Sequence, residues 1–67
     1  MYYTNPPDVC DIDGKPFDTR MYDCKTKSGP WGNICHTCYL KHGVGLGTGR
    51  GQKYERQPDG RWLKVAG

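Results

Sequence analysis

Two cysteines two residues apart carry the strongest chemical signal in this sequence. His36 and Thr37 separate Cys35 from Cys38. At this spacing, a turn at the start of a helix directs both thiolates toward one tetrahedral ion, about 2.3 Å from each sulfur. A redox C-x-x-C pair has the same spacing but needs a much larger α/β domain. The chain has only 67 residues, so the pair predicts half of a structural zinc site.

The other half of the site begins at Cys10. Residues 10–15 read CDIDGK, which keeps the glycine and lysine of a C-x-x-C-G-K zinc knuckle but has Asp13 in place of the second cysteine. Carboxylate oxygen does bind zinc, although structural sites favour thiolate, so Cys24 is preferred to Asp13 as the fourth ligand. Two ligand sets stay open: Cys10, Cys24, Cys35 and Cys38, or Cys10, Asp13, Cys35 and Cys38.

The cysteines and histidines of this sequence do not indicate a catalytic site. A catalytic zinc keeps an open position for water, and no side chain here is a convincing general base beside such a position. Cys35 and His36 are adjacent, and adjacent side chains on a helix point about 100° apart, so they do not form a nucleophilic pair. His36 or His42 is a less favoured choice of ligand, since each is expected to face solvent from the helix. We therefore expect one structural Zn²⁺ ion and no enzymatic activity.

The elements that position these ligands are short. With 34% hydrophobic residues and ten glycines, the chain can bury only a small core and needs a further cross-link to stabilise its fold. A bound metal ion would supply that cross-link. Alternating apolar and polar side chains predict a strand over residues 15–23, and residues 30–34 return as a second strand, with Trp31 covering the core. Residues 35–42 predict a helix of about two turns, ended by a left-handed cap at Gly43.

The remaining residues predict a second hairpin. Pro58, Asp59 and Gly60 form a turn between residues 52–57 and 61–65, and Tyr54 and Trp62 are available for cross-strand packing. Glycine occupies every second position over residues 43–51, but no phosphate-binding motif is satisfied, so a flexible or closely packed connection is expected. The chain is thus predicted as one small, metal-stabilised α+β zinc domain over residues 1–67, with an extended lead-in at 1–8 and a glycine-rich segment at 43–53.

The net charge of +3 is unevenly distributed. Residues 1–34 hold four basic and five acidic side chains, whereas residues 35–67 hold six and two. Proteins that bind single strands combine cations, which neutralise phosphates, with aromatic rings, which stack on bases. The other interpretation of the cations and aromatic residues in the C-terminal half is an ordinary hairpin with solvated charges. The candidate contacts for nucleic acid or another partner are Arg50, Lys53, Tyr54, Arg56, Arg61, Trp62 and Lys64.

The chain start lacks the charged segment and apolar run of a signal peptide. No stretch approaches the roughly 18 apolar residues of a membrane span, and no lipidation signal is visible. A cytoplasmic location is therefore expected, where reduced cysteines favour metal over disulfides.

Two motifs resemble a group of small zinc-finger-like proteins encoded by bacteriophages and bacterial mobile elements. They are CDIDGKPFDTR at residues 10–20 and GPWGNICHTCYLKHGVGLGTGRGQKYE at residues 29–55. The group combines a C-x-x-C-G-K-P knuckle with GPWA-x-M-C-x-x-C and a GVGLGTG run. The resemblance implies a treble clef, in which a knuckle and a hairpin precede a helix whose first turn carries the last two ligands.

The same resemblance implies ligand positions at Cys10, Cys35 and Cys38. Asp13 stands where the group has a cysteine, and Cys24 stands where a small residue is expected. A ligand that has moved to Cys24 would account for both departures.

Two functions follow as hypotheses. The first is a zinc-finger module of phage or mobile-element origin that contacts nucleic acid or its associated machinery in the host cytoplasm. The alternative is a phage-type protein that binds and modulates a host protein through aromatic anchors: Trp31, Tyr39, Tyr54 or Trp62. Neither hypothesis involves a membrane or a small-molecule substrate.

Overall fold

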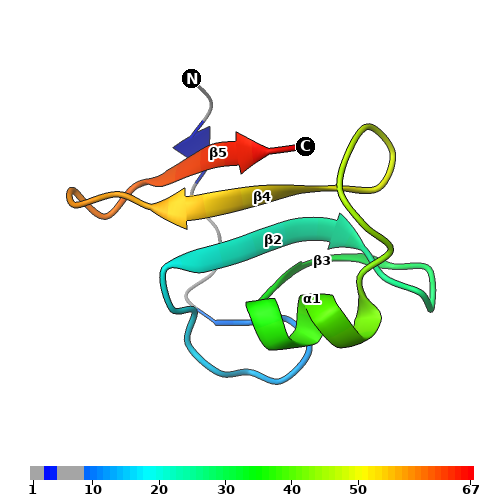
Figure 1. Ribbon diagram of the computed structural model, residues 1–67. Coiled ribbons are helices and arrows are strands. Elements are labelled where there is room, and N and C mark those ends of the chain that lie inside the picture. The colour runs from blue at the N-terminus through cyan, green and yellow to red at the C-terminus, as the bar shows by residue number, and fades with distance from the viewer. Residues whose placement is uncertain (1–2, 5–8) are drawn as a thin grey trace.

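One short helix and an antiparallel sheet make up the regular structure of the described part of this chain (Figure 1). The computed structural model describes residues 3–4 and 9–67. The strands follow the order β1-β5-β4-β2-β3 across the sheet. The α+β class is therefore as predicted. The elements are β1 (Tyr3–Thr4), β2 (Arg20–Lys25), β3 (Trp31–Ile34), α1 (His36–His42), β4 (Gly51–Arg56) and β5 (Trp62–Ala66).

The first hairpin forms between β2 and β3, as the sequence predicts, but β2 begins later than expected. Pro16 instead forms an isolated bridge with Val9. Asp18 then accepts a hydrogen bond from the backbone N–H of Arg20 at 2.7 Å, which makes a local turn before the strand. After this turn the Thr19 carbonyl accepts the Arg56 N–H at 3.0 Å, and β2 begins at Arg20.

Helix α1 packs on β2 through aromatic rings. The ring of Tyr22 stacks on that of Tyr39, with centroids 4.0 Å apart and planes within 8°. The Tyr22 hydroxyl lies 2.8 Å from Nδ1 of His36. The predicted left-handed cap at Gly43 is wrong, because its φ is −73°. A glycine is needed there for space: a Cβ would lie 2.6 Å from Cδ1 of Tyr39.

The hydrophobic core is one cluster that includes side chains from β2, β4 and β5. Phe17, Met21, Tyr54 and Trp62 are buried, and Phe17 meets Trp62 edge to face at 5.8 Å. The expectation that Trp31 covers the core is wrong, since 49% of this residue is exposed. Trp31 begins β3, the edge strand of the sheet, so no further strand lies beside it.

The C-terminal hairpin of β4 and β5 is confirmed, and β1 extends it. Tyr3 pairs with Leu63 and Thr4 with Trp62, so two residues of the predicted lead-in form a strand. Residues 1–2 and 5–8 lie outside the described part of the chain. Among the described residues, the one helix is far too short to cross a membrane.

Candidate metal centre

Residues 10–15, here called the knuckle, form a closed turn. The Cys10 N–H donates to the Lys15 carbonyl at 2.8 Å, and the Gly14 N–H donates to the Cys10 carbonyl at 3.0 Å. The Asp13 carboxylate accepts the Lys15 N–H through Oδ1 at 3.0 Å. This local bond fixes the Asp13 side chain and leaves Oδ2 available to other groups.

Asp11 fastens the knuckle to the edge strand β3. Its N–H donates to the Asn33 carbonyl at 2.9 Å, and its Oδ2 accepts the Asn33 N–H at 2.8 Å. These bonds set the position of Cys10 relative to the start of α1. Asp11 carries no local sequence signal for this role, because the contact spans 22 positions of the chain.

The other two thiols lie at the start of α1, as predicted. Cys35 is the N-cap residue of the helix, and its Sγ accepts the N–H of Cys38 at 3.5 Å. A residue at the N-cap and another in the first turn project to the same side of the helix start. The helix thus presents both sulfurs to the knuckle.

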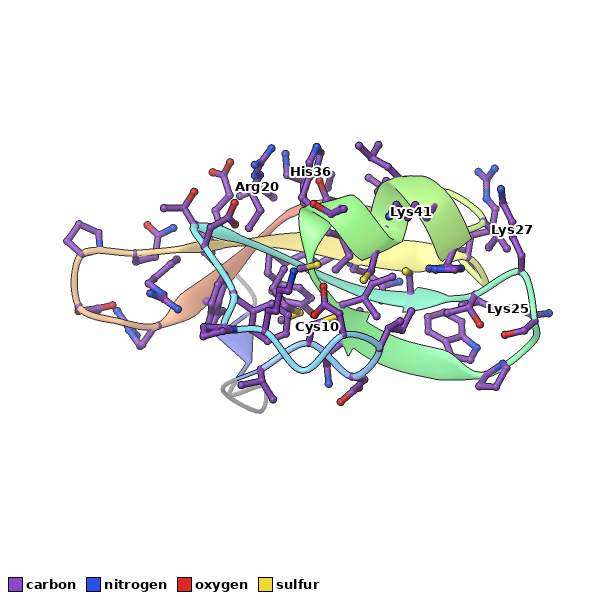
Figure 2. All side chains as sticks on the ribbon, turned by 90° about the horizontal axis from the view of Figure 1, so that it is seen from below. Cys10, Arg20, Lys25, Lys27, His36 and Lys41 are labelled. Atoms are coloured by element: carbon purple, nitrogen blue, oxygen red, sulfur yellow. The ribbon has the colours of Figure 1, made fainter. Side chains whose placement is uncertain are left out.

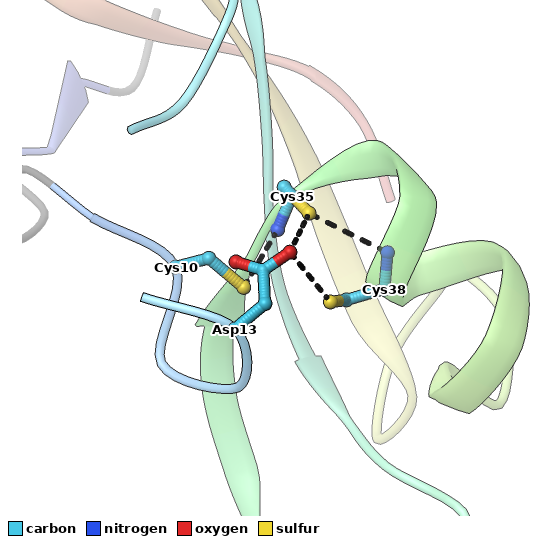
Figure 3. A group of neighbouring side chains, drawn as sticks. All are labelled: Cys10, Asp13, Cys35 and Cys38. Atoms are coloured by element: carbon cyan, nitrogen blue, oxygen red, sulfur yellow. Dashed lines mark hydrogen bonds between the residues drawn. The ribbon is translucent and has the colours of Figure 1, made fainter. Parts of the chain in front are cut away.

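Four potential ligand atoms meet where the knuckle faces the helix (Figure 3). Those of Cys10, Asp13, Cys35 and Cys38 all lie within 4.8 Å of one another. Oδ2 of Asp13 is 3.4 Å from Sγ of both Cys35 and Cys38. A tetrahedral zinc ion with ordinary bond lengths would separate its oxygen and sulfur ligands by about 3.5 Å. These residues lie close enough to hold one metal ion.

No protein-family model matches this chain, and no curated protein or solved structure is significantly similar to it. The chemistry of the centre therefore follows from its donor atoms. Three thiols and one carboxylate form a donor set typical of zinc and other thiophilic ions, whereas Mg²⁺ and Ca²⁺ prefer oxygen.

Backbone amides support the sulfur of Cys10. The N–H groups of Ile12 and Cys35 each donate to its Sγ at 3.4 Å. Such bonds stabilise a thiolate and orient it toward an ion. Cys10 is also the most buried member of the group, so the site has a sheltered side formed by sulfur and an exposed side formed by Asp13.

The protonation of the four groups differs. The hydrogen bond from the Lys15 N–H lowers the pKa of Asp13 to about 2, with smaller contributions from the three thiols, so its carboxylate is charged at neutral pH. Burial is the main cause that raises the pKa of Cys38, and hydrogen bonds with its neighbours raise it further. The raised pKa favours the protonated thiol when no metal is bound. A bound cation would favour the thiolate instead, since a coordinating thiol loses its proton.

Cys24, the preferred fourth ligand, does not join this group. It lies in β2, opposite Gly32 on one side and Gly51 on the other, and its side chain is buried in the core. A Cβ on Gly51 would overlap the Cβ of Cys24. Cys24 therefore fills space in the sheet, and the group of residues close enough to hold one metal ion contains Asp13 instead.

The predicted nucleic-acid contacts differ in their exposure to solvent. Tyr54 and Trp62 are only 3% and 6% exposed, so their rings belong to the core. Arg61 is paired with Asp59 at 2.7 Å. Arg56 lies over the Trp62 ring at 4.8 Å, and Lys53 lies 6.0 Å from the Tyr22 ring, against the helix-bearing part of the sheet. Four of these five cations, Arg50, Arg56, Arg61 and Lys64, are exposed, and Lys53 is half-buried.

Proposed function

We propose that this chain is a small nucleic-acid-binding module whose fold is stabilised by one structural zinc ion. The placement of the Asp13 carboxylate between the thiols of Cys35 and Cys38, with Cys10 completing the set, carries the zinc assignment. Four protein ligands leave no open position for water, which favours a structural ion over a catalytic one.

A metal at this centre would connect two segments that local forces hold weakly. The knuckle is a six-residue turn, and α1 has seven residues, a length that is unstable alone in water. An ion bound by Cys10 and Asp13 on one side and by Cys35 and Cys38 on the other would hold both in place. In small zinc domains the free energy of metal binding is also free energy of folding.

The order of the elements supports a treble-clef assignment. The knuckle comes first, the β2–β3 hairpin follows, and the helix carries the last two thiols at its start. The motif resemblance in residues 10–20 and 29–55 supports an origin in a phage or mobile element.

Nucleic acid is the proposed partner because of the charge distribution. The chain carries a net charge of +3, and its acidic residues are absent from residues 24–54. A cationic surface favours polyanions. A host protein is the second candidate, favoured by Leu40 on α1, which is 66% exposed.

Metal content and chelation test the zinc proposal. We expect one zinc per chain by elemental analysis, and a strong chelator should abolish the cooperative thermal melt followed by circular dichroism. Added zinc should restore it. The pair Cys38→Ser and Cys24→Ser provides the matched comparison: the first should lose zinc and the second should retain it. An unchanged melt after complete metal removal would overturn the structural-zinc proposal.

Binding assays test the choice of partner. Electrophoretic shifts of single- and double-stranded DNA and RNA at two salt concentrations should show micromolar, salt-sensitive binding by the zinc-loaded protein. No such binding would reject nucleic acid and leave the host protein as the partner.

A further inference from the structure

Three segments far apart in the sequence bring cations together at one end of the molecule. The Lys27 N–H donates to the His42 carbonyl at 2.7 Å, which joins the β2–β3 turn to the end of α1. The Val44 N–H donates to the Lys25 carbonyl at 3.2 Å, and the Lys25 N–H donates to the Arg50 carbonyl at 2.9 Å. We call the resulting group the basic end; it consists of the cations Lys25, Lys27, Lys41 and Arg50 together with the imidazole of His42.

The charges of the basic end are available to a partner. All five side chains are exposed, and Figure 2 shows Lys25 and Lys27 at the end of the molecule toward which Lys41 also lies. No acidic residue occurs within residues 24–54. The two ion pairs found in the described part of the chain, Arg20–Asp18 and Arg61–Asp59, each join neighbours in a different turn.

A cavity of about 320 Å³ opens beside the basic end. Thr26, Ser28 and His42 line it on that side, and Trp31 and Ile12 supply apolar walls. Trp31 is 49% exposed and lies directly opposite Lys25 in the β2–β3 register. An exposed indole and a lysine at paired positions are the residue types that single-strand binders use to stack a base and hold its phosphate.

The polar groups of the cavity suit a base edge. Asp11 lines it and accepts the Asn33 N–H through Oδ2. A carboxylate accepts several hydrogen bonds, so Asp11 retains capacity for an exocyclic amino group. The Ser28 hydroxyl lies 3.1 Å from Oγ1 of Thr26, which itself donates to the Pro30 carbonyl.

We infer that the Trp31 cavity takes an unpaired nucleobase while the basic end binds the adjoining phosphates, so that the partner is single-stranded nucleic acid. The inference rests on the proposed nucleic-acid function. It adds where the nucleic acid binds and that the bound strand is single. A base in a duplex is stacked and paired, so it cannot enter a cavity without being extruded. An acidic peptide would use the basic end alone and leave the cavity empty.

Fluorescence anisotropy with labelled oligonucleotides tests the location of the site. The zinc-loaded full chain is titrated with single strands and with the matching duplex, between about 50 and 200 mM salt. K25Q/K27Q should weaken single-strand binding on the order of tenfold and reduce the slope of log K against log salt by about 1.4. K53Q/K64Q removes the same charge from outside the basic end and should change both quantities much less. Equal losses in the two double variants would overturn the location.

Trp31 tests the cavity itself. W31A should weaken single-strand binding by at least about fivefold, whereas W31F, which keeps a smaller aromatic face, should recover part of the loss. Intrinsic fluorescence gives an independent readout, because Trp62 is buried: a single strand should quench wild-type emission, and W31F should abolish the quenching. Equal binding of duplex and single strand, or unchanged binding by W31A, would overturn the base-stacking site. Absence of any binding by the wild type would instead reject the proposed nucleic-acid function.

Discussion

Oδ2 of Asp13 lies 3.4 Å from Sγ of Cys38, although 25 positions separate these residues in the chain. The Lys15 N–H donates to the other carboxylate oxygen, so the contact joins the knuckle to the first turn of α1. The fourth corner of the candidate metal centre is therefore an exposed carboxylate, next to three sulfurs.

Two substitutions of Asp13, by alanine and by cysteine, should change zinc affinity in opposite directions. Asp13→Ala removes a ligand and should weaken zinc binding by at least about tenfold, since even outer-shell changes cost that much. Asp13→Cys completes a four-thiolate site and should strengthen it. In the cobalt-substituted protein, the thiolate charge-transfer absorbance of Asp13→Cys should rise by about a third, because four thiolates replace three.

Competition with a chromophoric chelator measures these affinities, and Cys24→Ala is the control that removes a thiol outside the centre. Its zinc affinity should match that of the wild type. If Cys24→Ala lost zinc and Asp13→Ala kept it, the four-cysteine ligand set would be correct.

Cys24 should make the folded state sensitive to alkaline pH. Burial raises the pKa of its thiol from 9.0 to about 11, with a smaller effect of Asp23. The folded chain therefore holds this proton more tightly than the unfolded chain. Its contribution to the free energy of unfolding is complete below pH 9.0 and is lost as the pH rises through about 11.

Chemical denaturation of the zinc-loaded protein across that pH range provides the measurement. The wild type should lose more stability than Cys24→Ala, while Tyr22, whose pKa burial also raises, is common to both proteins. Parallel pH profiles for the two proteins would contradict the prediction.

Gly51→Ala should destabilise the sheet. Its Cβ would overlap the Cβ of Cys24 and lie 3.0 Å from the Gly45 carbonyl oxygen. Forced overlap in a packed core typically costs about 1–3 kcal/mol of unfolding free energy. The double variant Gly51→Ala/Cys24→Gly should recover part of the loss caused by Gly51→Ala. Additive effects in this double-mutant cycle would show that the two sites do not interact.

Tyr22→Phe should weaken the attachment of α1 without removing its ring stack. The hydroxyl lies 2.8 Å from Nδ1 of His36, and its removal should cost about 0.5–1.5 kcal/mol of unfolding free energy. Hydrogen exchange of the α1 amides should accelerate as well. Tyr39→Phe keeps the stacked pair and serves as the comparison; an equal loss in both variants would assign no special role to the Tyr22 hydroxyl.

Local features of the fold were predictable from sequence. The turn at Pro58–Gly60, the hairpins on either side of the helix and the helix start at Cys35 depend on turn residues and on alternation of side chains, which act over a few positions. The exposure of the two tryptophans was not predictable, because burial depends on strand order. Trp31 was expected to cover the core but is exposed, and Trp62 was a candidate partner contact but is buried. Trp31 lies on an edge strand, whereas Trp62 lies between β1 and β4.

The sequence by itself determined that Cys10, Cys35 and Cys38 share a metal-binding pattern, because the spacing of a knuckle and of a helix start is local geometry. Only the tertiary structure decided that Asp13 joins them and that Cys24 does not. That choice depends on the register of β2 against β3 and β4, which places Cys24 between two glycines in the sheet. The same register and the turns it connects gather Lys25, Lys27 and Arg50 at one end, where no window of the sequence places them together.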